Sequence, residues 1–201
     1  MTSFHDLLRQ QELDLPEITR HLDSLGSEER IRQVRDIPGK LQAPLFDAVR
    51  GYRALDLPAF VPTDCPDRQF VRHYGKNSLP LFSIFEKRFA RPGPASPVLW
   101  GFNHGALMGI IGPGHFVMRS GPLPGELHVD YYSIPSEQLE GAPNLVENDV
   151  GISTLVYGNM IDVLRGVSEH VTIGRAVKKG KDTPNYFLLC REEHGTEQQP
   201  G

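Results

Sequence analysis

A chain of 201 residues is long enough for one sizeable core, and it predicts a single domain with a helical N-terminal region. Its net charge of −4 lacks the basic excess of a nucleic-acid-binding protein, so we expect no nucleic-acid partner. Two cysteines exclude a disulfide framework, and no apolar run is long enough for stable membrane insertion. The N-terminal stretch does not resemble a signal peptide, so we expect a cytoplasmic protein, with a homodimer left open.

Residues 1–54 carry apolar side chains at helical spacing and predict a small helical region. Pro16 is placed to begin one helix at its first turn, and Ser27 is placed to cap the next. Pro38 and Gly39 end that helix, and the apolar spacing beyond them predicts a further one. We expect these helices to cover one face or one end of the remaining structure.

Residues 55–97 predict an irregular, aromatic-rich connector, because several prolines interrupt any regular pattern at its start. Phe82, Phe85 and Phe89 recur at helical spacing after Pro80, so a short helix is predicted there. Such aromatic side chains either fill a core or line a site for an apolar ligand, and both roles stay open.

Residues 98–192 are divided by glycine and proline turns into short segments that predict strands. The expected strands are 98–103, 106–111, 115–119, 126–134, 169–177 and 185–191, with a helix at 153–165. Short strands without long helical connections imply an antiparallel sheet. The predicted fold class is therefore α+β, with the N-terminal helical region packed on a curved antiparallel sheet or a small β-barrel. Residues 193–201 predict a disordered tail.

The strand expected at 126–134 has two chemically different faces, because side chains alternate along a strand. Its odd positions are Leu, Val and Tyr, and they are expected in the core. Its even positions carry an imidazole, a carboxylate and a phenol, which are groups that serve in general acid–base catalysis. With a histidine of a later strand they form the predicted catalytic set, His128, Asp130, Tyr132 and His170. The alternative is a buried hydrogen-bond network or an exposed polar face.

A second set of side chains is predicted to contact a ligand. Aromatic and basic groups near the turns form this set, which is Trp100, Phe102, His115 and Arg175. Arg175 also begins a basic turn with lysines at 178, 179 and 181, which could bind a carboxylate or phosphate headgroup at a barrel mouth. A solvated turn is the alternative interpretation of these charges.

An iron site is an alternative use of the same histidines. His128-x-Asp130, followed by the distant His170, has the order of a facial site with two histidines and one carboxylate. About one such His-x-acid triplet is expected by chance in this composition, and His21-x-Asp23 is another. The alternative function is therefore a non-haem metal-dependent oxygenase with Fe bound by these residues.

The first functional hypothesis is binding of an apolar or amphipathic small molecule in a barrel or curved-sheet cavity. It requires no cofactor, and acid–base turnover of an isomerase or cyclase kind would extend it. A further alternative is a non-enzymatic interaction module whose N-terminal helices dock a partner. The chain has no G-x-S-x-G, G-x-G-x-x-G or H-E-x-x-H motif that would choose among these, so whether it is an enzyme stays open.

Overall fold

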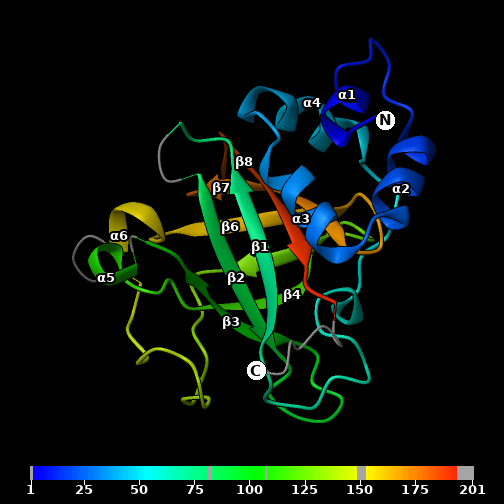
Figure 1. The fold of residues 1–201 in the computed structure, drawn as a ribbon. Helices are drawn as coiled ribbons and strands as arrows, with labels where there is room; N and C mark the ends of the chain where they lie inside the picture. The colour runs from blue at the N-terminus through cyan, green and yellow to red at the C-terminus, as the bar shows by residue number, and fades with distance from the viewer. Residues whose placement is uncertain (1, 81–82, 107, 149–152, 194–201) are drawn as a thin grey trace.

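Eight antiparallel strands close into a barrel, and helices of the N-terminal region pack against its outer surface (Figure 1). This computed structural model describes residues 2–80, 83–106, 108–148 and 153–193. The strands are β1 Val71–Asn77, β2 Ile84–Ala90, β3 Leu99–His104, β4 Phe116–Ser120, β5 Leu127–Asp130, β6 Met160–Gly166, β7 Val171–Lys178 and β8 Lys181–Arg191. The helices are α1 Phe4–Leu7, α2 Leu15–Ser24, α3 Ser27–Arg35, α4 Gln42–Ala48, α5 Met108–Ile111 and α6 Ser153–Val156, with short 3₁₀ turns η1 Gly39–Leu41 and η2 Leu57–Ala59.

The strands follow one another around the barrel in chain order, and the pairing of β1 with β8 closes it. Alternate side chains of each strand point into the barrel, where apolar groups from all sides form one core. The segment 55–65 closes one end of the barrel, because Phe60, Val61 and Cys65 are buried in that same core. The opposite end of the barrel contains a cavity.

Two glycines of the barrel wall make room for aromatic rings of the neighbouring strands. A Cβ atom on Gly101 would lie 2.4 Å from the ring of Phe116, and one on Gly174 would lie 2.2 Å from the ring of Phe187. Both distances are far below van der Waals contact, so only glycine fits at these positions. The outer edges of these rings therefore lie directly against the backbone of the barrel wall.

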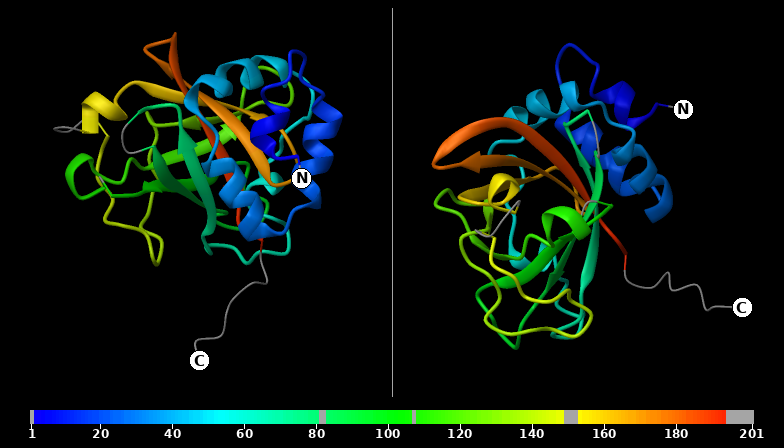
Figure 2. Two further views of the ribbon diagram at one scale, coloured as in Figure 1. Left: turned by 45° about the horizontal axis from the view of Figure 1, so that its top comes forward. Right: turned by 90° about the vertical axis from the view of Figure 1, so that its left-hand side faces the viewer.

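The N-terminal helices form a second core between themselves and the barrel (Figure 2). Side-chain caps begin α1 and α2, at Ser3 and Asp14 respectively. α3 contacts β1 and β8, and α4 contacts β7 and β8. Their apolar faces bury the outward side chains of β7 and β8, including Ile173, Leu188 and Cys190. The outer surface of these strands is therefore covered rather than solvated.

A buried arginine ties the helical region to the barrel. Arg165 of β6 pairs with Glu126 at 2.6 Å and donates to the backbone oxygen of Phe46 at 2.8 Å. Its guanidinium also lies 3.9 Å from the centre of the Phe46 ring. Because all of these groups are buried, they fix the position of α4 on the barrel.

The predicted fold class is confirmed, as is the hairpin of β7 and β8. The helix predicted after Pro80 is wrong, because residues 84–90 form β2. The spacing of Phe85 and Phe89 also fits alternate positions of a strand, and pairing with β1 and β3 decides between the two. The connector predicted at 55–97 therefore contains two barrel strands, β1 and β2, in its second half.

Two other predicted elements differ from the structure. The strand expected at 106–111 is replaced by α5, which forms part of the connection between β3 and β4. The helix expected at 153–165 is a single turn, α6, followed by the strand β6. β-Branched residues favour a strand there once β5 and β7 offer hydrogen bonds on both sides. The disordered tail was predicted at 193–201, and residues 194–201 lie outside the described residues. Its first residue, Glu193, is described and pairs with Arg30 at 2.7 Å.

Candidate functional site

A cavity of about 520 Å³ occupies the end of the barrel that segment 55–65 does not close. Its mouth lies between the β1–β2 connection, α5, α6 and residues 185–187 of β8. Its walls are largely apolar and aromatic, with Phe85, Tyr157, Met160 and Phe187 among them. A volume of this size is typical of sites for small organic molecules.

A cluster of four polar side chains lies at the inner end of this cavity. Lys87 donates from Nζ to Asp162 Oδ2 at 3.0 Å and to Asn103 Oδ1 at 2.8 Å. The Tyr131 hydroxyl accepts a further hydrogen bond from Lys87 and itself contacts Asp162 at 3.3 Å. All four side chains are buried, and they come from β2, β3, β6 and the residue directly after β5.

The barrel register brings these four residues together. Lys87 and Asn103 are direct partners on β2 and β3, so their side chains share the inner face. Asp162 is the partner of Val129 on β5, and Tyr131 follows two positions later on that inner face. The cluster therefore bridges the barrel interior between strands that are far apart in the sequence.

Burial and mutual attraction act against each other in the charged pair. Burial lowers the pKa of Lys87, and the nearby Asp162 carboxylate opposes this shift. Burial likewise raises the pKa of Asp162, and the Lys87 ammonium opposes that shift. The pKa of Tyr131 is raised well above its ordinary value by burial and by the Asp162 charge. The pKa values of Lys87 and Asp162 are thus shifted toward each other, whereas the shift of Tyr131 keeps its hydroxyl protonated as a hydrogen-bond donor.

Aromatic rings surround the ammonium group. Lys87 Nζ lies 5.0 to 5.2 Å from the ring centres of Phe116, Tyr131 and Phe187. Tyr157 stacks on Tyr131 with ring centres 5.3 Å apart, and burial raises the pKa of Tyr157 to about 12. The rings favour the charged lysine without adding a negative charge, so Asp162 carries the only full negative charge within this group of residues.

The predicted catalytic residues are placed away from the cavity. β5 turns its apolar face inward, as predicted for the core, so His128 and Asp130 lie on the outer face. Asp130 pairs there with Arg119 at 3.1 Å, and the next-but-one residue, Tyr132, is 57% exposed. His170 lies after β6, near Glu193 at 3.6 Å. The structure keeps His128 beside Asp130 and does not bring His170 to them.

The same placement bears on the iron alternative. The described residues hold no group of three or more His, Cys, Asp or Glu side chains arranged to bind a metal ion. His128 and Asp130 share one strand face, as their spacing implies, and a third ligand is not brought beside them. The residues that the structure describes therefore give no support to a facial iron site.

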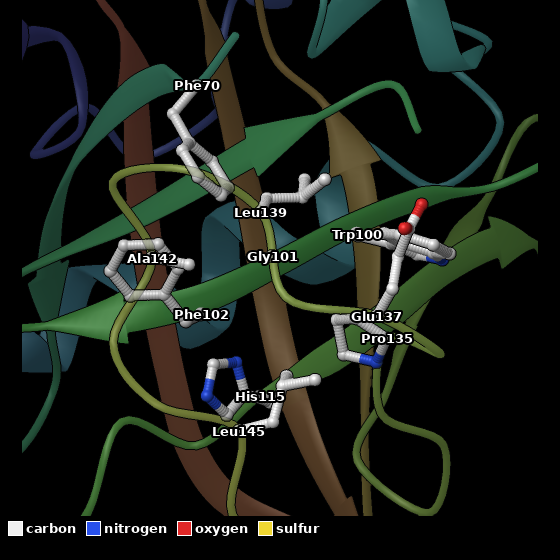
Figure 3. Close-up of a pocket in the computed structure, with 10 residues that line it drawn as sticks. All are labelled: Phe70, Trp100, Gly101, Phe102, His115, Pro135, Glu137, Leu139, Ala142 and Leu145. Atoms are coloured by element: carbon white, nitrogen blue, oxygen red, sulfur yellow. The ribbon is translucent and has the colours of Figure 1, made fainter. Parts of the chain in front are cut away.

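Three of the predicted ligand residues do gather, on the outside of the barrel (Figure 3). Trp100, Phe102 and His115 lie under the segment 135–145, where His115 Nε2 is 3.0 Å from the backbone oxygen of Asn144. The space left between them is about 10 Å³, which is room for one water molecule. This arrangement is a packed contact between the segment and the barrel wall.

Arg175, the fourth predicted ligand residue, lies apart from these three. It pairs with Asp182 at 2.7 Å, and its guanidinium lies 5.0 Å from the centre of the Phe46 ring. These contacts fix it between the β7–β8 hairpin and α4. Its charge is therefore already matched within the fold.

Two residues of the buried cluster, Lys87 and Asp162, were missed because helices were predicted for their segments. Tyr131 was predicted in the core and Asn103 on a strand, and both placements are confirmed. Phe85, Lys87 and Phe89 alternate with polar residues, and this places the lysine on the aromatic face of a strand. A lysine on an apolar strand face is a signal for a buried, paired charge. Asp162 gave the matching signal on β6, where it stands among β-branched and aliphatic residues.

No family model, curated protein or solved structure matches this chain. In the described ranges, no helix is both long and apolar enough to cross a membrane.

Proposed function

We propose that the protein binds an amphipathic small molecule in the barrel cavity and moves protons on its polar group. The observation that carries this proposal is the cluster of Lys87, Asp162, Tyr131 and Asn103 at the inner end of an otherwise apolar cavity. A buried ion pair adds little stability compared with apolar side chains of similar size. Its presence beside a ligand-sized space is therefore better explained by a role in binding or chemistry.

The charges of the cluster favour a ligand whose polar group is neutral. The Lys87 ammonium is already matched by Asp162 at 3.0 Å, so the cluster has no net charge. A carboxylate entering the same space would be buried without its own counter-ion, at a cost of several kcal/mol. A carbonyl or hydroxyl oxygen would instead accept a hydrogen bond from the Tyr131 hydroxyl and bring no charge, since the three N–H groups of Lys87 are already used within the cluster.

The same groups supply an acid and a base side by side. Asp162 is the base of the cluster, and its raised pKa makes it a stronger proton acceptor than an exposed carboxylate. Tyr131 is a donor, and Lys87 a neighbouring positive charge, and both would stabilise negative charge developing on a ligand oxygen. Proton abstraction next to a carbonyl group, followed by return of the proton to a different atom, is the reaction that this pairing favours.

The binding part is tested with a series of medium-chain molecules of one length, an alkane, a methyl ketone, a primary alcohol and a carboxylate. Isothermal titration should show tighter binding of the ketone and the alcohol than of the carboxylate. In the double variant Lys87→Met/Asp162→Leu, the preference for ketone over alkane should fall about tenfold, because two polar partners are removed. Equal affinity for every member of the series, in both proteins, would contradict the proposal.

The turnover part is tested by exchange of the ketone's α-hydrogens with deuterium in D₂O, followed by NMR. The wild-type protein should accelerate the exchange, and Asp162→Asn should abolish the acceleration while the ketone still binds. His128→Gln is the matched control, because it removes a titratable group from the outer face of β5. Binding without any accelerated exchange would leave a carrier and overturn the catalytic role of Asp162.

A further inference from the structure

The mouth of the cavity is ringed by exposed aliphatic side chains. Leu79, Ile84 and Val156 line the cavity and are also exposed, and Ile110 of α5 is 67% exposed. Eight large apolar side chains are exposed in the described part of the chain, and these four are half of them. They come from the β1–β2 connection, β2, α5 and α6, which meet at one end of the barrel (Figure 2). Such a concentration at one opening marks an interaction surface.

A basic turn lies beside this ring. The turn between β7 and β8 carries Lys178, Lys179 and Lys181. The backbone N–H of Lys179 donates to the oxygen of Asn159 at 2.8 Å, and Asn159 follows α6 closely in the chain. Lys179 and Lys181 are exposed, while the one acidic residue next to them, Asp182, is paired with Arg175. The turn therefore presents positive charge at the edge of the aliphatic ring.

We propose that this end of the barrel docks on the surface of a bilayer that contains anionic lipids. The exposed aliphatic side chains would enter the boundary between headgroups and acyl chains, and the flanking lysines would contact negative headgroups. Burial of apolar surface and electrostatic attraction are the two forces that bind proteins to such bilayers. Because these side chains surround an open cavity, a rigid protein partner would need a protruding group of matching shape. A fluid apolar surface needs none. An amphipathic ligand would then pass directly between the bilayer and the cavity.

The inference stands on the rim residues and not on the buried cluster, so it can be tested separately from the proposed function. Cosedimentation is measured with vesicles of phosphatidylcholine and with vesicles of equal parts phosphatidylcholine and phosphatidylglycerol. Wild-type protein should bind the mixed vesicles more tightly, and added salt should weaken that binding. Ile110→Asp should reduce binding to the mixed vesicles at every salt concentration, because it places a charge in the aliphatic ring.

The lysines are tested by substitutions that the backbone accepts. Lys179 has a φ of 51°, a conformation that asparagine adopts readily, so Lys179→Asn removes the charge without strain. Lys179→Asn and Lys181→Gln should each weaken binding to mixed vesicles about fivefold at low salt. Arg20→Gln is the matched control, because it removes an exposed charge from α2.

A matched apolar control is Leu123→Asp, which changes an exposed leucine in the β4–β5 turn at the opposite end of the barrel. This variant, and the cavity variant Lys87→Met/Asp162→Leu, should bind mixed vesicles as the wild type does. Failure of the wild type to sediment with mixed vesicles would overturn the proposal. Equal losses in Ile110→Asp and Leu123→Asp would also overturn it, as would equal affinity for the two kinds of vesicle.

Discussion

Lys87 and Asp162 face each other across the barrel interior, with Nζ 3.0 Å from Oδ2 and each side chain 3% exposed. They belong to β2 and β6, which are not neighbours in the barrel. The pair therefore joins opposite walls of the barrel at the inner end of the cavity. Removing one partner leaves the other as a buried, unmatched charge, so the two side chains should depend on each other for stability as well as for function.

The first prediction concerns this dependence. Lys87→Met should lower the free energy of unfolding by about 3–5 kcal/mol, because Asp162 is left buried without its counter-ion. The double variant Lys87→Met/Asp162→Leu should recover most of that loss, since it replaces both charges with apolar groups. Urea unfolding at neutral pH measures both values. If the loss in the double variant equals the sum of the losses in Lys87→Met and in Asp162→Leu, the two residues act independently and the prediction is contradicted.

The second prediction concerns the pH dependence of stability. His73 is fully buried beside Phe60, and burial lowers its pKa from 6.5 to about 3. The unfolded chain therefore binds a proton that the folded chain does not bind between these two values. The stabilising contribution is complete above pH 6.5 and is lost as the pH falls toward 3, by about 5 kcal/mol.

His73→Phe isolates this contribution, because the phenyl ring keeps the packing against Phe60 and Phe89 and cannot take up a proton. Urea unfolding of both proteins is measured at a series of pH values from 7 downward. The stability of the wild type should fall more steeply than that of the variant below about pH 6.5. Parallel profiles for the two proteins would contradict the assigned pKa shift.

The third prediction concerns the wall of the barrel. Gly101→Ala would place a Cβ atom 2.3 Å from the backbone oxygen of Arg88, and backbone cannot move aside as a flexible side chain can. The variant should lose about 3 kcal/mol or more, or fail to fold. Gly93→Ala is the control, because nothing lies within 4 Å of its added Cβ atom, and it should change stability by less than about 0.5 kcal/mol. Thermal unfolding of both variants compares the two positions.

The fourth prediction uses two neighbouring tyrosines. Tyr131 is buried against Lys87 in the cavity, whereas Tyr132 is 57% exposed on the outside. Tyr131→Phe should weaken binding of the methyl ketone about fivefold, because one hydrogen-bond donor is lost. Tyr132→Phe and Trp100→Ala should leave that binding unchanged. Isothermal titration with one ketone measures the affinity of each variant. A loss of affinity in Tyr132→Phe or Trp100→Ala, with none in Tyr131→Phe, would place the binding site on the outer face.

The elements predicted correctly are those with strong local signals. Prolines and apolar spacing indicated the N-terminal helices, and alternation indicated the β7–β8 hairpin and the two faces of β5. The cap predicted at Ser27 is wrong, because Ser27 is the first residue of α3 and Gly26 is its N-cap. β2 and β6 were missed because their apolar residues fit a helix nearly as well as a strand. Hydrogen bonds to neighbouring strands decide such segments, and those neighbours are distant in the sequence.

Local residue patterns are enough to predict an α+β chain with N-terminal helices, short antiparallel strands and one strand with an apolar and a polar face. Barrel closure decided the rest, because it fixed which face of each strand points inward. Closure placed His128 and Asp130 on the outer face and brought Lys87, Asn103, Tyr131 and Asp162 to one buried point. Side chains from separate strands meet only through register and curvature, and neither is encoded in the local spacing of residues.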